Sequence, residues 1–309
     1  MDLLRSKPER PLDSDCCGQG CDPCILDIYA EEIKIWEEEC RQFLAGEKLC
    51  KKLTLQVKEE SGPVLKPSEY NNFTIESVEK ETGDSYRYRF KLPNGASLGL
   101  QAGQHVVVRG DVSREIITRQ YTPVSDTGAK SFFELLIKIY ETGRMSQYVK
   151  TWIVGTEVQM RGPCGTFEYQ PNKYKRLYML AVGTGIAPMA QIIQTVLNNE
   201  EDETMVTLLY GCKTYQDILL KTEIDDWSRY WNFTCTYFLS QEPEFESKVA
   251  YKYGDKVIQS RITCHTVHTV IPDEQDNFLV LICGTRSFEQ DMIKCMTELN
   301  VTEQKYHKF

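Results

Sequence analysis

The sequence predicts a two-domain protein of the α+β and α/β classes, with a small antiparallel β-barrel followed by a parallel sheet covered by helices. At 309 residues, the chain is long enough for two compact domains and an additional segment. Short β-type runs separated by turn residues fill residues 72–169, and from Arg176 onward apolar strands alternate with helices. We therefore expect a Cys-rich segment and linker over residues 1–68, the barrel over 69–172 and the α/β domain over 173–309.

The opening segment contains a Cys and Gly cluster followed by an acidic run, DIYAEEIKIWEEECRQFL. Apolar residues recur in this run at roughly helical spacing and predict a short amphipathic helix. Gly62, Pro63 and Pro67 indicate a linker over residues 58–68. The apolar positions of the predicted helix are Ile28, Ile33, Ile35, Trp36, Phe43 and Leu44.

Cysteine is abundant, with twelve residues, six of them in the first fifty positions. Because no secretory signal is recognisable, we interpret the cysteines as reduced thiols or metal ligands and not as a disulfide framework. Cys21 and Cys24 have metal-ligand spacing, and Cys16 or Cys17 would complete a soft thiolate site. One CxxC pair alone is weak support, so a bound metal and a plain thiol-rich docking motif both stay open.

The net charge of −9 lies mostly in the first fifty residues, where twelve acidic side chains outnumber six basic ones. This balance argues against nucleic acid as a partner. The most apolar long window, 178–197, contains Gly183, Gly185 and Pro188 in a strand, turn and helix pattern, which favours a buried α/β unit over a membrane span. We expect no transmembrane segment, and a protein that is cytoplasmic or peripheral to an intracellular membrane and not secreted.

The barrel strands are expected in the runs FTIESVEKET, SYRYRFKLP, HVVVRG, REIITRQYTPVS, FFELLIKIYE and EVQMRGP. In the second half, strands are expected in LYMLAVG, TMVTLLYG, FTCTYFLS and FLVLICG. Helices are expected in APMAQIIQTVLNN, around KTEIDDWSRY and in RSFEQDMIKCMTELN. Apolar runs that end in glycine are typical of parallel strands covered on both faces.

The heptapeptide RQYTPVS ends one barrel strand. FAD needs a cation for its pyrophosphate, a flat side chain against its isoalloxazine ring and a polar group near N5. Arg119, Tyr121 and Thr122 supply these three in order. The alternative is a surface turn that happens to contain Arg and Tyr.

Further along, the strand LLIKIY carries Lys138, and GRMSQYV places Gly143, Met145 and Ser146 at a predicted helix start. Free backbone N–H groups and the helix dipole at this point suit a second contact with the pyrophosphate. Ser146 would alternatively cap the helix, and the two interpretations are compatible.

Two later motifs follow predicted parallel strands. In AVGTGIAPM, Gly183 and Gly185 would let a dinucleotide approach the backbone, although such turns often serve only close packing. In LICGTRSF, Cys283 and Gly284 end a strand where a thiol would lie beside a nicotinamide, and the alternative is a buried, small apolar cysteine.

Taken in order, RQYTPVS, IKIY, GRMSQYV, RGPCGTF, VGTGIAPM and CGTRSF resemble the ferredoxin reductase superfamily and, within it, NADH-cytochrome b5 reductases. The resemblance covers residues 72–309. It implies a six-stranded antiparallel FAD-binding β-barrel followed by a Rossmann-like parallel-sheet NAD-binding domain. It implies cofactor contacts at Arg119, Gln120, Tyr121, Thr122, Leu136, Ile137, Lys138, Gly143, Arg144, Met145, Ser146, Gly183, Thr184, Gly185, Cys283, Gly284 and Phe309, of which Thr122, Lys138 and Cys283 are the expected catalytic residues.

The chain departs from the family pattern at several positions. Gln120 replaces a proline, Arg144 a lysine, and Ala187 a threonine whose hydroxyl is expected near the flavin. The segment 285–287 replaces a proline run, which affects the positioning of the nicotinamide. The opening DCCGQGCDPCILDIYAEEIKIW resembles an oxidoreductase-like N-terminal module, and this match implies no biochemical role.

The resemblance implies an FAD-dependent reductase that transfers a hydride from NADH to flavin and then single electrons to an acceptor such as cytochrome b5. The alternatives are a reductase of the same fold for another acceptor, and a flavin-containing scaffold whose Cys-rich segment binds a metal or a partner. We expect a monomer. We also expect NADH to be preferred over NADPH, because the turn after FTCTYFL holds Glu242 and Glu244 and no basic residue before Lys248. Ser240 stands about where the family commonly has an Asp, so the preference should be weaker than usual.

Overall fold

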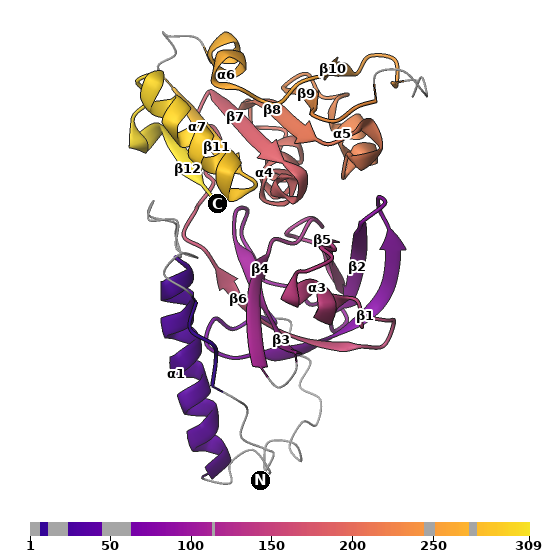
Figure 1. Cartoon of the computed structure of the whole chain (residues 1–309), viewed down its shortest axis with the longest axis vertical. Helices are drawn as coiled ribbons and strands as arrows, with labels where there is room; N and C mark the ends of the chain where they lie inside the picture. Colours follow the sequence, from indigo (N-terminus) through magenta and orange to yellow (C-terminus); the bar gives the residue numbers. More distant parts are fainter. Residues whose placement is uncertain (1–6, 12–23, 45–62, 113–114, 244–250, 272–276) are drawn as a thin grey trace. The chain divides into compact units, whose positions relative to one another are not determined.

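Two compact units make up the chain in the computed structural model, which describes residues 7–11, 24–44, 63–112, 115–243, 251–271 and 277–309 (Figure 1). The first unit comprises Met1–Glu79 and Arg87–Phe167, and the second comprises Lys80–Tyr86 and Glu168–Phe309. Each unit is built around one six-stranded sheet.

The sheet of the first unit contains β1 (Asn71–Lys80), β2 (Ser85–Lys91), β3 (His105–Val112), β4 (Glu115–Tyr121), β5 (Phe132–Lys138) and β6 (Glu157–Cys164), in the order β4-β3-β6-β1-β2-β5. The pairs β1–β6, β3–β4 and β3–β6 are antiparallel. After β4, Pro123 pairs with Leu135 of β5, and the Val124 N–H donates to the Glu134 carbonyl at 2.9 Å. Because β4 and β5 are the outer strands, this contact closes the sheet. The predicted six-stranded antiparallel barrel is confirmed.

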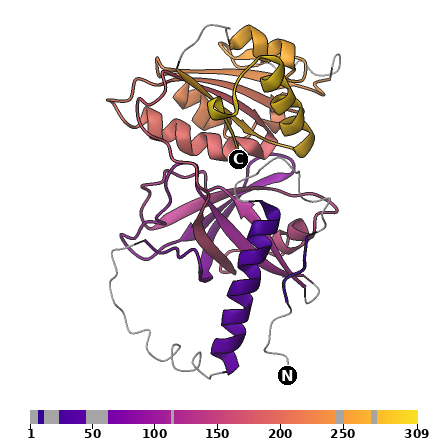
Figure 2. The same cartoon turned by 90° about the vertical axis from the view of Figure 1, so that its left-hand side faces the viewer.

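Helix α1 (Ile25–Leu44) lies across the barrel, as Figure 2 shows. Its buried face carries Ile28, Glu32 and Ile35, a spacing of four and three residues that places the three on one side of a helix. The sequence analysis correctly placed Ile28 and Ile35 on the packed face. The acidic residue Glu32 lies on the same face, and only 3% of its surface is exposed.

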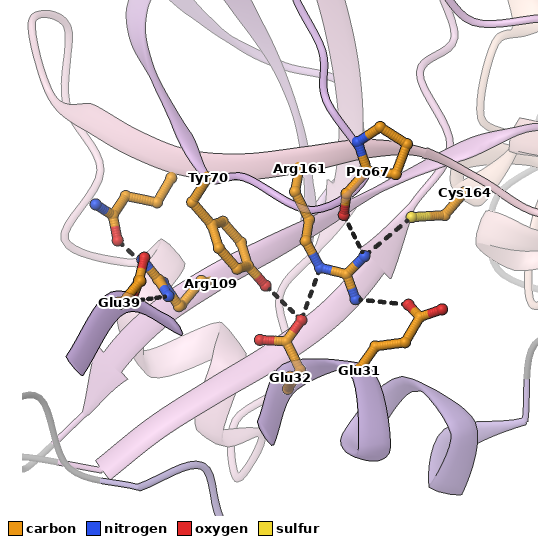
Figure 3. A network of polar contacts seen from close by, with 9 residues as sticks. Glu31, Glu32, Glu39, Pro67, Tyr70, Arg109, Arg161 and Cys164 are labelled. Carbon is orange, nitrogen blue, oxygen red and sulfur yellow. Dashed lines mark hydrogen bonds and ion pairs between the residues drawn. The ribbon is translucent and has the colours of Figure 1, made fainter. Parts of the chain in front are cut away.

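A buried ion pair joins α1 to the barrel (Figure 3). The Arg161 Nε of β6 donates to the Glu32 Oε1 at 2.8 Å, and the side chains of both residues are almost fully buried. The Tyr70 hydroxyl donates to the same oxygen at 2.8 Å. Arg161 also donates to the Pro67 carbonyl at 3.0 Å and contacts the more exposed Glu31 at 3.3 Å. The buried polar side chains of Glu32, Tyr70 and Arg161 therefore each have a partner in this network.

A second ion pair lies two helical turns further along α1. Arg109 of β3 donates through two nitrogens to the two oxygens of Glu39, at 3.1 and 3.0 Å, and its Nε donates to Gln159 at 3.1 Å. Its guanidinium also lies 3.8 Å from the centroid of the Tyr70 ring. The helix is thus part of the first unit, although the sequence analysis treated residues 1–68 as a separate segment ending in a linker. Within that linker, residues 63–68 are described and Leu65 is buried.

The sheet of the second unit contains β7 (Arg176–Val182), β8 (Met205–Cys212), β9 (Phe233–Leu239), β10 (Lys256–Ile258), β11 (Phe278–Cys283) and β12 (Tyr306–Lys308), in the order β10-β9-β8-β7-β11-β12. Neighbouring strands are parallel. The helices are α4 (Ile186–Leu197), α5 (Lys221–Trp227), α6 (Cys264–Val270) and α7 (Arg286–Glu298). The predicted strands and helices are confirmed. The elements β10, α6 and β12 were not predicted. The strands β10 and β12 are three residues long, which is too few to show a periodic pattern, and α6 buries only Val267 among its seven residues.

Both faces of this sheet are covered. Alternating residues of β7 and β11, for example Tyr178 and Val280, pack in one cluster with Val267 of α6 and Met292 of α7. The buried helix α4 packs against β7 and β11. The residues that flank Tyr178 and Val280 in these two strands are buried too. This double coverage explains why the strands are continuous apolar runs.

One expectation about cysteine is wrong in the second unit. Cys264 of α6 and Cys295 of α7 form a disulfide, with their Cα atoms 5.2 Å apart. Reduced thiols or metal ligands were expected because no secretory signal is recognisable in the sequence. Cys264 and Cys295 are 31 positions apart, and only the packing of α6 on α7 brings them together. Within the described ranges, none of the helices combines the length and the apolar character that a membrane crossing requires.

Candidate functional site

The motif RQYTPVS lies where the barrel closes. Arg119 pairs with Val108 of β3, and the chain continues through Tyr121 to the bridge between Pro123 and Leu135. Because the two segments run antiparallel there, Tyr121 and Thr122 come beside the end of β5, which contains the other predicted residues Leu136, Ile137 and Lys138. The structure thus brings two predicted groups of site residues together.

The side chains at this end of β4 differ in exposure. Arg119 and Gln120 are exposed, and one guanidinium N–H of Arg119 donates to the Thr118 carbonyl at 2.7 Å. No ion pair among the described residues involves Arg119, so its other N–H groups face no carboxylate. Tyr121 and Thr122 are half-buried. Burial raises the pKa of Tyr121, and the positive charge of Arg119 opposes this shift, so the phenol stays neutral.

On the β5 side, Leu136 and Ile137 are buried in the core, whereas Lys138 is half-buried. Successive side chains of a strand point to opposite faces, so the buried side chains of Leu136 and Ile137 lie on opposite sides of β5. A ligand at this site would contact their backbone.

Helix α3 (Arg144–Val149) begins after Gly143 and packs on β3 and β4. Its N-cap is Gly143, which provides no side-chain hydrogen bond. The Ser146 hydroxyl accepts from the Tyr140 N–H at 3.0 Å, so Ser146 holds the preceding loop and does not cap the helix. Met145 and Ser146 are buried, and the first N–H groups of a helix have no acceptor within it.

Among the predicted site residues at the start of α3, Arg144 already has carboxylate partners. Its guanidinium pairs with Glu115 of β4 and with Glu9 from the N-terminal segment. The backbone of Arg144 remains at the first turn of α3. Its side chain would have to leave two carboxylates to reach a phosphate.

These residues fit FAD by their donor chemistry. Arg119 supplies a cation, the first turn of α3 supplies backbone donors, and Tyr121 supplies a neutral aromatic ring within the same unit. The exposed Arg119 is a suitable phosphate contact because it has no carboxylate partner among the described residues.

In the second unit, the predicted glycine motifs meet at the carboxyl edge of the sheet. Cys283, the last residue of β11, pairs with Ala181, the last but one residue of β7. A Cβ on Gly185 would come within 2.2 Å of the Cys283 carbonyl oxygen, and one on Gly284 within 2.3 Å of the Val182 side chain. Close packing of the two turns thus explains these two glycines.

Gly183 needs a different explanation. Its φ is +53° and a Cβ there would meet nothing within 4 Å, so the backbone is open toward its surroundings. The Tyr210 hydroxyl donates to its carbonyl at 2.9 Å and fixes the turn. The segment Gly183–Gly185 therefore combines a rigid turn with a backbone that a phosphate can approach.

The last strand ends beside this edge. Lys308 of β12 pairs with Ile282 of β11, and the Phe309 N–H donates to the Ile282 carbonyl at 3.1 Å. Phe309 is thereby held next to Cys283. Burial raises the pKa of the Cys283 thiol and the carboxylate of Glu289 adds to the shift, so this thiol is protonated at neutral pH.

Three domain families match the sequence: an oxidoreductase FAD-binding domain over residues 72–169, an oxidoreductase NAD-binding domain over 179–294, and the N-terminal part of an oxidoreductase-like protein over 2–45. The "NADH-cytochrome b5 reductase-like" protein of Mus musculus is 40% identical over 99% of this chain and 96% of its own length. The protein of the same name in Homo sapiens is 38% identical over 99% of this chain and 95% of its own. The chain belongs to the NADH-cytochrome b5 reductase family.

Solved structures share the fold of this chain. The cytochrome b5 reductase domain of Ulva prolifera nitrate reductase superimposes with a TM-score of 0.70 and 24% identity, covering 80% of this chain and 100% of that domain. The CS-b5R domains of human Ncb5or give a TM-score of 0.67 and 23% identity, covering 78% of this chain and 69% of that one. At these identities the likeness concerns the fold alone.

The oxidoreductase-like module of this reductase contains the predicted metal ligands. Cys16, Cys17 and Cys21 lie outside the described residues, and Cys24 is half-buried just before α1. Among the residues that the structure describes, no group of three or more His, Cys, Asp or Glu side chains is placed to hold a metal. The residues that attach this module to the barrel, Glu32 and Glu39, were not predicted from the sequence. The pattern that would have indicated them is their spacing of seven residues along the apolar stripe of α1.

Proposed function

We propose that the chain is an FAD-dependent reductase that takes a hydride from NADH and passes single electrons to an acceptor protein, with cytochrome b5 as the first candidate. The proposal is supported by Arg119 and Tyr121 at the end of β4, by Lys138 at the end of β5 where the barrel closes, and by α3 packed on β4, in a chain of this family. FAD, when bound, supplies the acceptance of a hydride and the release of single electrons. The residues of the chain supply binding and orientation.

The first unit would hold FAD through complementary groups. Arg119 and the backbone of Arg144, Met145 and Ser146 would bind the pyrophosphate, because cations and free N–H groups stabilise phosphate charge. The neutral Tyr121 ring would pack against the isoalloxazine. Gln120 and Gly143 flank these contacts.

Thr122 and Lys138 are proposed as the polar groups nearest the reacting ring. Both are half-buried, at the ends of the two segments that meet where the barrel closes. A hydroxyl and an ammonium there would hydrogen-bond the flavin and orient it.

The second unit would hold NADH at the carboxyl edge of its sheet. The open backbone at Gly183–Gly185 would admit the dinucleotide phosphates, with Thr184 between the two glycines. Cys283 and Gly284 would lie beside the nicotinamide. Because the Cys283 thiol is protonated, it acts as a neutral contact and not as a nucleophile.

Cofactor extraction and reduction assays test the proposal. We expect the purified protein to release FAD and not FMN, because the first turn of α3 offers a contact for a second phosphate. Anaerobic NADH should bleach the flavin rapidly, and added cytochrome b5 should then be reduced. Release of FMN, or a flavin that NADH leaves oxidised, would contradict the assignment.

A second candidate is a scaffold that keeps flavin for stability. Ala187 favours it, because this 6% exposed residue lacks the hydroxyl that the family places near the flavin. Slow or absent bleaching by NADH, combined with full FAD occupancy, would support the scaffold. Rapid bleaching without reduction of cytochrome b5 would indicate a reductase for another acceptor.

A further inference from the structure

The strand next to the glycine turn ends in a lysine. In a sheet of this topology the first strand leads into the glycine turn, and the end of the second strand lies near the adenosine ribose of a bound dinucleotide. Here β7 leads into Gly183–Gly185, and β8 is the next strand both along the chain and in the sheet. The residue that follows β8 is Lys213, and it is exposed.

The structure holds Lys213 beside the turn after β9. The Ser240 N–H donates to the Cys212 carbonyl at 3.0 Å, and the Gln241 N–H donates to the Lys213 carbonyl at 2.8 Å. Ser240 is exposed as well, and its hydroxyl donates to the Cys212 carbonyl at 3.2 Å. A cation and a hydroxyl from neighbouring strands are therefore adjacent at one edge.

The carboxylates nearby are directed to other partners. Glu242, on which the sequence analysis based the preference for NADH, accepts from the Tyr215 N–H at 2.7 Å. Asp217 accepts from the Thr214 N–H at 3.1 Å and from its hydroxyl at 2.8 Å. Neither acid neutralises Lys213, because no ion pair among the described residues includes that lysine.

A lysine in this place changes the expected selectivity. Sites for NADH commonly place a carboxylate against the ribose hydroxyls, and sites for NADPH place a cation near the 2′-phosphate. The turn after β9 alone contains no cation among residues 240–243, so the sequence analysis found none. The parallel pairing of β8 with β9 adds one from the neighbouring strand.

We propose that Lys213, next to the turn that contains Ser240, binds the 2′-phosphate of NADPH, so that the chain accepts this dinucleotide as well as NADH. The role of NADPH as a reductant rests on the proposed function. The binding of a 2′-phosphate by these residues does not depend on it.

Calorimetric titration of the full-length protein with 2′,5′-ADP and with 5′-AMP tests the inference, because these probes differ in the 2′-phosphate and need no flavin chemistry. We expect 2′,5′-ADP to bind more tightly than 5′-AMP. In Lys213→Met, the affinity for 2′,5′-ADP should fall about fivefold more than the affinity for 5′-AMP, as is reasonable for one exposed charge pair. Lys213→Arg should retain the selectivity.

Salt and a control variant sharpen the result. Raising the ionic strength from about 0.01 M to about 0.1 M should reduce the selectivity of the unmodified protein, because the Debye length falls from about 30 to about 10 Å. Lys294→Met on α7 is the matched control, since Lys294 is also exposed and has only a 4.0 Å contact with Glu298. It should behave like the unmodified protein.

Two results would overturn the inference: equal losses for both probes in Lys213→Met, or the same change in Lys294→Met. Stopped-flow mixing with NADPH separates this question from the proposed function. If the probes show the selectivity but neither NADH nor NADPH bleaches the flavin, the proposed function fails and the 2′-phosphate site stands. If NADH alone bleaches the flavin and the probes bind equally, the site fails and the proposed function stands.

Discussion

Replacing Glu32 by Gln should strongly destabilise the first unit. Arg161 and Glu32 are 1% and 3% exposed and their charged groups lie 2.8 Å apart, so the substitution leaves a buried guanidinium without its main counter-charge. Removing one partner of a buried ion pair costs about 3–5 kcal/mol. The glutamine oxygen can still accept from Tyr70 and Arg161, so we expect the lower end, about 3 kcal/mol.

Thermal unfolding of the holoprotein, followed by flavin fluorescence, measures this effect. A loss of about 3 kcal/mol corresponds to a midpoint lower by roughly 6–12 °C for a unit of this size. The matched control is Glu31→Gln. Glu31 contacts the same arginine at 3.3 Å, but its side chain is 59% exposed, so the loss should be below about 1 kcal/mol.

A double variant completes the test. Glu32→Met combined with Arg161→Met removes both buried charges and should be less destabilising than Glu32→Gln, because paired charges are often replaceable by apolar side chains of similar volume. The reasoning would be refuted if Glu32→Gln cost no more than Glu31→Gln. It would also be refuted if the double variant were the least stable of the three.

Three further outcomes are expected. Arg119→Ala should lose flavin, because a charge-assisted contact is worth about 1.5–3 kcal/mol, or roughly 10- to 150-fold in affinity; full flavin occupancy would reject the contact. Chelators, or loss of Cys21 and Cys24, should leave the flavin spectrum and its reduction by NADH unchanged, and collapse of either would show that the opening segment supports the flavin. Stability should also fall in acid through His105, whose pKa is lowered from 6.5 to about 4 by burial and by the charge of Arg161. Because the unfolded chain binds this proton more tightly, the free energy of unfolding should be highest above pH 6.5 and should fall by about 3 kcal/mol between pH 6.5 and pH 4. A His105→Gln variant whose free energy of unfolding has the same slope between these pH values would contradict this.

Local patterns were sufficient for much of the fold. Every run predicted as a barrel strand is a strand, and the glycine turns after β7 and β11 lie where the motifs placed them. An alternation of apolar and polar residues in a strand, or an apolar run ending in glycine, indicates which residues are buried from a few neighbouring positions alone. The motif order therefore indicated the two sheets and the turns that follow β7 and β11.

Only the tertiary structure decided how distant charges pair. The acidic residues of α1 resemble a solvent-exposed face, because nothing within the helix shows that Arg161 lies 129 positions away from Glu32, or Arg109 70 positions away from Glu39. Burial makes these pairs consequential, since a charge inside a protein needs a partner. Likewise, Lys213 and Ser240 are 27 positions apart in the sequence and become neighbours only because β8 and β9 are adjacent in the sheet.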